Sequence, residues 1–199
     1  MFVAYGDSAR QECAKAIYSL RQHHDWPVTV MAEGPIEGAA HVYAPRLDPG
    51  VRLVKLNMDT LSPYESTLYL DADTRVRGDL SAGFGVLADG WEMAIAPSPR
   101  QHGDALGNCS ERDRDATWET YGTRWLLALQ GGVMFWRRCE AMSRLFAAWR
   151  EEWARFRQMD QAALLRALWQ VPVRLWLLGH DWNERNGALL SHLHGRAAR

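Results

Sequence analysis

Short apolar runs alternate with amphipathic stretches along this chain, a pattern that predicts strands followed by helices. The run at 2–5 is followed by a stretch with apolar residues at every third or fourth position, and then by a second apolar run at 28–31. A strand, a helix and a strand within about thirty residues predict a βαβ unit with parallel strands. Ser8 and Gln11 have the spacing of a capping box, so the helix is expected to open there.

The same pattern continues toward the end of the chain. It predicts further strands at 41–43, 51–56, 66–70, 91–96, 129–136 and 171–178, and helices at 81–88 and 139–156. A last helix is expected after Met159 with Asp160 as its N-cap, and Pro172 marks the final strand as a sheet edge. Alternation of this kind predicts an α/β fold with a mostly parallel, Rossmann-like central sheet flanked by helices.

The strand that starts at Ser66 ends on two carboxylates one residue apart, Asp71 and Asp73. Because side chains alternate along a strand, both carboxylates are expected on one side, with Cα atoms roughly 6–7 Å apart. Two carboxylates hold Mg²⁺ or Mn²⁺ loosely, since these cations take about six ligands and obtain the others from water and substrate phosphates. The pair therefore predicts a metal site for a phosphorylated ligand, unless the acids only form the turn that ends the strand.

Two glycines, Gly131 and Gly132, interrupt the strand pattern at 129–136. Glycine weakens a strand, so the pair predicts either a bulge or a ligand that lies against the backbone.

A polar segment at 97–115 contains several prolines and glycines and ends in a charged run at 111–115. A loop of this length is interpreted either as a substrate lid or as a solvated insertion.

Composition and charge narrow the class of protein. A chain of 199 residues, 47% of them hydrophobic, suits one globular domain. A net charge of −1 gives no general attraction to nucleic acid or to anionic membrane, so neither is expected as a partner. No apolar run is long enough to span a membrane, and the first residues do not have the pattern of a signal peptide.

Three widely spaced cysteines form neither a disulfide framework nor a zinc pattern, so a cytoplasmic location is expected. The oligomeric state is left open.

The order of these motifs resembles the nucleotide-sugar glycosyltransferases of the GT-A fold, especially the retaining family 8 enzymes related to glycogenin and the bacterial galactosyltransferases. The likeness covers most of the chain. It implies a single GT-A domain over 1–199, with a nucleotide-binding part at about 1–96 and an acceptor and sugar part at about 97–199. The motifs that carry it are Val3-Ala4-Tyr5, Tyr69-Leu70-Asp71-Ala72-Asp73-Thr74, Gln130-Gly131-Gly132-Val133-Met134, Asp160-Gln161, Trp182-Asn183 and His192 to Gly195.

The resemblance implies a set of metal ligands. Asp71 and Asp73 would be the DxD pair, with Asp71 also reaching the donor. His192, three residues before Gly195, would be the third ligand, and His194 is its rival. Two carboxylates and an imidazole suit Mn²⁺, with Mg²⁺ as the other candidate.

The resemblance also implies which residues bind the donor. Asp160 and Gln161 match the pair that faces the donor sugar near the reacting carbon, and they are the candidates for catalysis. Gln130 stands where the family usually has Asn, so its amide is one methylene further out. The substrate-binding candidates are Tyr5 at the uracil pocket, Asp71, Gln130, Gly131, Gly132, Trp182 and Asn183.

The function implied is metal-dependent transfer of a sugar from a UDP-sugar to an unknown acceptor, with retention. The tail lacks the Lys-Pro-Trp that often grips the diphosphate, and Arg196 and Arg199 are the candidates to replace it. One alternative is an inactive domain that only binds nucleotide. Another is a haloacid dehalogenase-type phosphatase with Asp71 as nucleophile and Asp73 as acid/base. Such enzymes need a downstream Lys, or sometimes Arg, to hold the phosphate, and this chain has no lysine after Lys55.

Overall fold

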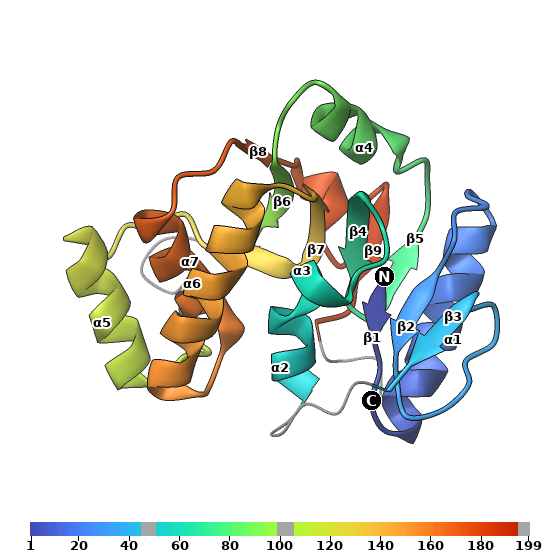
Figure 1. The fold of residues 1–199 in the computed structure, drawn as a ribbon, viewed down its shortest axis with the longest axis horizontal. Coiled ribbons are helices and arrows are strands. Elements are labelled where there is room, and N and C mark those ends of the chain that lie inside the picture. The colour runs from blue at the N-terminus through green and yellow to red at the C-terminus, as the bar shows by residue number, and fades with distance from the viewer. Residues whose placement is uncertain (45–50, 99–105, 195–199) are drawn as a thin grey trace.

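A computed structural model of the chain describes residues 1–44, 51–98 and 106–194 (Figure 1). Its first unit is a parallel three-stranded sheet in the order β1-β2-β3, with α1 between the first two strands. The predicted βαβ unit is therefore confirmed. The predicted capping box is wrong, because α1 begins at Asp7 with Gly6 as its N-cap and no side-chain capping bond. The bounds are β1 (Phe2–Val3), α1 (Asp7–Arg21), β2 (Thr29–Met31) and β3 (His41–Tyr43).

The second sheet has four strands in the order β4-β7-β6-β8. Strand β7 runs antiparallel to both β4 and β6, and only β6 and β8 pair in parallel. The predicted mostly parallel sheet is thus wrong: the strands form separate sheets of mixed direction. A continuous apolar run is typical of a parallel strand, but what it reports is burial on both faces, and the antiparallel strand β7 is buried in the same way. The bounds are β4 (Ser66–Leu70), β6 (Met93–Pro97), β7 (Leu129–Arg137) and β8 (Leu175–Leu177), the last at the sheet edge as expected.

Two further contacts tie these parts together. The amino group of Met1 donates to the Leu68 carbonyl at 2.6 Å, and the Leu70 amide donates to the Met1 carbonyl at 3.1 Å, so β1 lies beside β4. A small antiparallel ribbon pairs β5 (Thr74–Val76) with β9 (Leu190–His192). This ribbon brings the end of the described chain to the residues that follow β4.

Residues 51–56 were expected as a strand, but they form the helix α2. The six residues Val-Arg-Leu-Val-Lys-Leu fit the two-residue repeat of a strand and also the 3.6-residue repeat of a helix, because their apolar positions fall on one side of a helix. Packing on α6 favours the helix, and Arg150 of α6 donates to the Leu56 carbonyl at 2.9 Å. Arg52 and Lys55, three positions apart, consequently lie on one helix face.

Helices lie on both sides of the strands, except α5, which packs against α7 (Figure 1). Two buried apolar clusters result, one beneath α6 and α7 and the other beneath α1 and α4. The apolar stripe predicted for 139–156 is confirmed, since its members from Met142 to Trp153 are buried. The bounds are α2 (Val51–Leu56), α3 (Met58–Leu61), α4 (Ser81–Ala88), α5 (Glu111–Tyr121), α6 (Glu140–Phe156), α7 (Asp160–Gln170) and the short 3₁₀ turn η2 (His180–Trp182).

The charged run at 111–115 was expected to close a long loop, but it opens α5. Ser110 is the N-cap and accepts the Asp113 amide at 3.3 Å, and Gly122 ends the helix with φ 65°. Acidic residues in the first turn favour this start because they face the positive end of the helix dipole. Residues 99–105 lie outside the described residues, so the lid stays a prediction.

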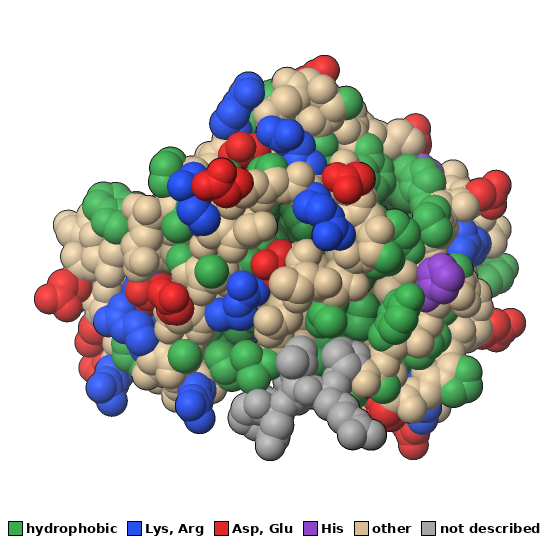
Figure 2. All heavy atoms as spheres, in the orientation of Figure 1, with side chains coloured by type: hydrophobic (Ala, Val, Ile, Leu, Met, Phe, Trp, Pro, Cys, Tyr) green, Lys and Arg blue, Asp and Glu red, His purple; other side chains and the backbone are tan. Residues whose placement is uncertain are grey.

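Acidic and basic side chains are interspersed on the face drawn in Figure 2, in line with a net charge near zero. Among the described helices, none has the length and apolar character needed to cross a bilayer.

Candidate metal and donor site

The two acids lie in the turn between β4 and β5, one and three residues beyond the strand that was expected to carry them. The amide and hydroxyl of Thr74 both donate to the Asp71 carbonyl, at 3.2 and 2.8 Å. The Asp71 amide donates to the Gly132 carbonyl at 2.8 Å, which anchors the turn to β7. A tight turn, rather than strand alternation, therefore brings the two carboxylates to one side.

His192 reaches the acids because β9 pairs with β5 so that His192 lies opposite Thr74. Its Nε2 atom is 3.1 Å from Asp73 Oδ1 and 3.7 Å from Asp71 Oδ2. Ligand atoms of the three residues all lie within 4.8 Å of one another, and among the described residues this is the one cluster that could hold a metal ion. Neighbouring ligands of an octahedral cation with bonds of about 2.1 Å are about 3 Å apart, so the cluster fits with small adjustments.

The other nitrogen of His192 is fixed by Asn183. The Asn183 Nδ2 group donates to the Pro97 carbonyl at 3.0 Å, which turns Asn183 Oδ1 toward His192 Nδ1 at 2.7 Å. An amide oxygen only accepts, so Nδ1 carries the proton and the lone pair of a neutral ring is on Nε2. The Nε2 atom faces two carboxylates, an arrangement that a shared cation would stabilise.

Gly132 leaves room for this cluster. A Cβ atom at this position would lie 2.5 Å from Asp71 Oδ2 and 2.5 Å from His192 Cε1, closer than atoms in van der Waals contact approach. The pairing of β7 with β6 shifts register between Ile95 and Ala96, opposite the two glycines. The predicted bulge is therefore confirmed, and it lies against the candidate metal ligands.

Asp71 has one oxygen engaged by the protein. Its Oδ1 atom accepts the Tyr69 hydroxyl at 2.6 Å and lies 3.5 Å from Lys55 Nζ. Burial, and then the charge of Asp71, raise the pKa of Tyr69 well above its usual value, so the hydroxyl stays a donor. Oδ2 faces His192 and is the oxygen available to a cation.

Lys55 also holds Asp160, the first residue of α7. Its Nζ atom is 3.0 Å from Asp160 Oδ2, and Arg52 Nε is 3.6 Å from Asp160 Oδ1. Burial alone would raise the pKa of Asp160, but Lys55 and then Arg52 lower it below the usual value, so Asp160 is a carboxylate. Asp160 was expected as the N-cap of α7, but Met159 takes that position.

Sequence reasoning missed Lys55 as a site residue. It is one of only two lysines in the chain, and a helical reading of 51–56 would have placed it on one face with Arg52. Burial alone would lower the pKa of Lys55, whereas Asp160 and Asp71 raise it above its usual value.

A pocket of about 310 Å³ opens beside these residues. Its volume is at the lower end of the range for small-molecule sites. The candidates Asp160, Gln161, Gln130 and Gly131 all line it, together with Lys55. Among the described residues the Gln161 amide has no hydrogen-bond partner, so it is available to a ligand.

The other candidates lie around this pocket or behind it. His194 stacks on His192 with ring centroids 4.1 Å apart, and its nitrogens face Gln130 at 3.5 Å and the Asn183 carbonyl at 3.2 Å. Trp182 packs edge-on against Phe135 in the core. We retain their expected roles as predictions.

Tyr5 has a buried hydroxyl with no hydrogen-bond partner among the described residues. Burial, and then Glu33, raise its pKa. A buried hydroxyl without a partner calls for an explanation, and the predicted contact with a nucleotide base would supply the missing partner. The predictions for Gly195, Arg196 and Arg199 concern residues outside the described ones.

No protein-family model matches the chain, and no curated protein matches it. Solved structures do. The bifunctional glycosyltransferase WbbM superposes with a TM-score of 0.70 at 14% identity, over 98% of this chain and 45% of that one. Mouse xyloside xylosyltransferase 1 gives 0.66 at 10% identity, over 100% and 98%. The galactosyltransferase LgtC, solved with donor and acceptor sugar analogues, gives 0.60 at 15% identity, over 98% and 86%.

This chain spans less than half the length of WbbM but most of the other two. At such low identity the likeness concerns the fold. The resemblance drawn from the motifs is confirmed at that level: the chain has the GT-A fold that these glycosyltransferases share.

Proposed function

We propose that this chain is a metal-dependent glycosyltransferase that moves a sugar from a UDP-sugar to an acceptor, with retention at the anomeric carbon. The observation that carries the proposal is the convergence of Asp71, Asp73 and His192 on the GT-A fold, with ligand atoms within 4.8 Å of one another. The residues come from two distant parts of the sequence.

Two carboxylate oxygens and one imidazole nitrogen form a donor set that suits Mn²⁺ and also accepts Mg²⁺. Such a cation, when bound with the donor, stabilises the negative charge that develops on the departing diphosphate. Asp71 Oδ2, Asp73 Oδ1 and His192 Nε2 would hold it.

The protein itself supplies charge on the side of the sugar. Breaking the bond to the diphosphate makes the sugar oxocarbenium-like, and a nearby carboxylate stabilises that charge. Asp160 is ionised and lines the 310 Å³ pocket. Gln161, next to it, offers a free amide to the sugar. Lys55 lies between Asp71 and Asp160, and its charge offsets the repulsion between the two carboxylates.

Two alternatives remain as outcomes of the test. An inactive domain would bind Mn²⁺ and UDP without releasing sugar. A haloacid dehalogenase-type phosphatase would hydrolyse phosphate esters through Asp71, but the GT-A likeness disfavours it.

The test is a screen of UDP-sugars, with other nucleotide sugars beside them, for slow hydrolysis in the presence of Mn²⁺ and again with chelator. We expect UDP release from at least one UDP-sugar that stops when metal is removed. Binding of Mn²⁺ and UDP without release from any donor would favour the inactive domain. Phosphate release from phosphate esters would favour the phosphatase.

A further inference from the structure

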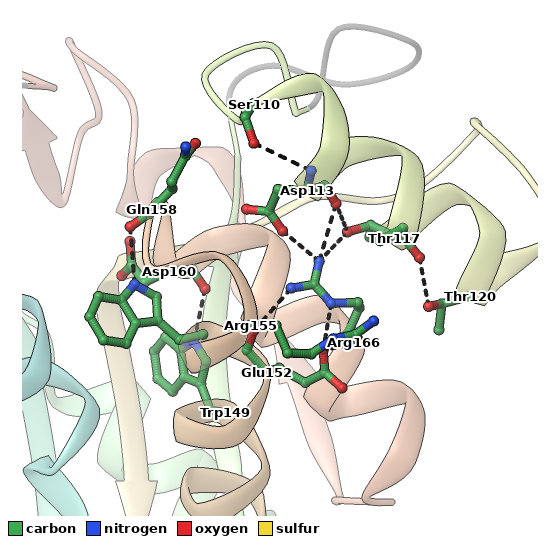
Figure 3. Close-up of polar contacts among 12 residues, drawn as sticks. Ser110, Asp113, Thr117, Thr120, Trp149, Glu152, Arg155, Gln158, Asp160 and Arg166 are labelled. Carbon is green, nitrogen blue, oxygen red and sulfur yellow. Dashed lines mark hydrogen bonds and ion pairs between the residues drawn. The ribbon is translucent and has the colours of Figure 1, made fainter.

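The turn that carries Asp160 is held by two tryptophans of α6 (Figure 3). Trp149 Nε1 donates to the Asp160 carbonyl at 2.8 Å, and Trp153 Nε1 donates to the Gln158 carbonyl at 3.0 Å. The turn itself passes through Arg157 in the left-handed region, at φ 53°. The two bonds are alike in chemistry, yet they fix different residues of the turn.

Only Trp149 also reaches the pocket. Its ring carbon Cη2 lies 3.5 Å from the point where a Cβ atom on Gly131 would stand. Trp149 lines the 310 Å³ pocket, whereas Trp153 does not. Both side chains are otherwise buried in the same cluster. Trp149 therefore connects Gly131 of β7 with Asp160 of α7.

Asp160 is consequently restrained at both ends. Its carboxylate is held by Lys55 and Arg52 from α2, and its main chain is held by Trp149 from α6. A catalytic carboxylate must keep its position closely, because a displacement of about 1 Å can cost on the order of a hundredfold in rate.

We propose that Trp149 is a positioning residue of the sugar pocket, whose indole N–H sets the place of Asp160 relative to the donor. This inference rests on the proposed function. Trp149 acts through Asp160, and among the described residues its indole N–H bonds to Asp160 and to none of the metal ligands, so its effect belongs to turnover and not to metal binding.

Two variants separate the contacts of Trp149. Trp149→Phe keeps a six-membered ring but has no N–H, while Trp149→His keeps an N–H at the equivalent ring position and loses the benzene ring. Trp153→Phe is the matched control, because it removes the same type of bond one helical turn away. Each variant is measured for kcat and donor KM in Mn²⁺-dependent UDP-sugar hydrolysis, for Mn²⁺ affinity, and for thermal stability.

We expect kcat of Trp149→Phe to fall roughly tenfold or more, with donor KM within about threefold and Mn²⁺ affinity within about twofold of wild type. Trp149→His should be less stable than Trp149→Phe because it leaves a larger cavity. Trp149→His should nevertheless have a higher kcat than Trp149→Phe, because it keeps the N–H. If Trp149 acted through packing alone, the less stable His variant would have the lower kcat. Trp153→Phe should keep kcat within about twofold.

An unchanged kcat in Trp149→Phe would overturn the inference, as would an equal loss in Trp153→Phe or no recovery in Trp149→His. If Trp149→Phe fails to fold, the comparison of Trp149→His with Trp153→Phe decides, and a His variant with roughly tenfold lower kcat than the control would overturn it. If wild type is inactive with every donor, both the proposed function and this inference are refuted. If wild type is active and the variants do not behave as expected, only the inference about Trp149 is refuted.

Discussion

The Nδ1 atom of His192 lies 2.7 Å from the Oδ1 atom of Asn183, and this contact links the candidate metal site to the sheet. Asn183 is itself bonded to the Pro97 carbonyl at the end of β6, and both side chains are buried. The imidazole is therefore oriented by the protein, with its Nε2 atom directed at Asp71 and Asp73. Partners of this kind tune a metal site without touching the metal.

Asn183→Ala should weaken Mn²⁺ binding by about 10- to 100-fold, because His192 loses the acceptor that fixes its tautomer and ring orientation. Asn183→Asp, which retains an acceptor oxygen for Nδ1, should lose less. Titration of Mn²⁺ followed by electron paramagnetic resonance measures both. Wild-type affinity in Asn183→Ala would show that the contact does not position His192.

The neighbouring glycines provide a matched pair. Gly132→Ala places a methyl carbon 2.5 Å from Asp71 Oδ2 and should weaken Mn²⁺ binding about tenfold or more. Gly131→Ala meets Lys55 Nζ and Trp149 Cη2 at 3.5 Å, which is ordinary contact, and should bind Mn²⁺ within about twofold of wild type. The same titration compares them. Equal affinities in the two variants would contradict the assigned geometry.

Arg166 of α7 is the buried centre of a network that joins three helices (Figure 3). Its guanidinium donates to Asp113 Oδ1 at 2.7 Å and to Thr117 at 2.6 Å on α5, and to Glu152 Oε2 at 2.6 Å on α6. Burial alone would raise the pKa of Glu152, but hydrogen bonds from Arg166, Arg155 and Gln170 lower it. The network fixes α7 behind Asp160.

Arg166→Met should lower the free energy of unfolding by about 3–5 kcal/mol, because it removes the cation paired with the buried Asp113 and leaves Glu152 with the more exposed Arg155. Arg155→Met removes an exposed partner of the same Glu152 and should cost no more than about 1 kcal/mol. Urea unfolding followed by tryptophan fluorescence measures both. A loss for Arg166→Met as small as that for Arg155→Met would refute the importance of the network.

His24 should make stability depend on pH. Its Nε2 atom accepts the Leu80 amide at 2.9 Å, and burial lowers its pKa although Asp79 opposes this. With a folded-state pKa below the unfolded value of about 6.5, the unfolded chain takes up the proton first as pH falls. The contribution of His24 is therefore complete above pH of about 6.5 and is lost as pH drops toward the folded-state pKa.

His24→Gln keeps an acceptor near the position of Nε2 but does not titrate. Its melting temperature should fall less than that of wild type between pH 7.5 and pH 5.5, two values that bracket the unfolded pKa of about 6.5. Identical pH profiles of the melting temperature would contradict the assignment.

The sequence predicted most elements of the fold and the core stripe of α6, because apolar periodicity reports burial directly. It failed on strand direction, and it failed on 51–56, where six residues fit both periods. That single misassignment also concealed Lys55, since only a helix places Lys55 on one face with Arg52. Packing against α6 decides the conformation there, and packing is not encoded locally.

The sequence alone predicted Asp71 and Asp73 as metal ligands, but it did not by itself identify the third ligand. His192 is distant in sequence, and only the motif resemblance singled it out before the pairing of β5 with β9 brought it to the acids. The role of Asn183 toward His192 needed coordinates, because the sequence shows an amide next to Trp182 and not what that amide contacts.

The central claim is that Asp71, Asp73 and His192 hold a cation together with a nucleotide diphosphate, and thermal unfolding tests it most directly. With Mn²⁺ and UDP at about 100 times Kd, wild type should gain about 2.7 kcal/mol, a rise of roughly 5–10 °C in Tm for a chain of this size. Asp73→Asn should remove most of that rise while keeping its metal-free Tm close to that of wild type. A wild-type Tm that Mn²⁺ and UDP leave unchanged, or an equal rise in Asp73→Asn, would contradict the account.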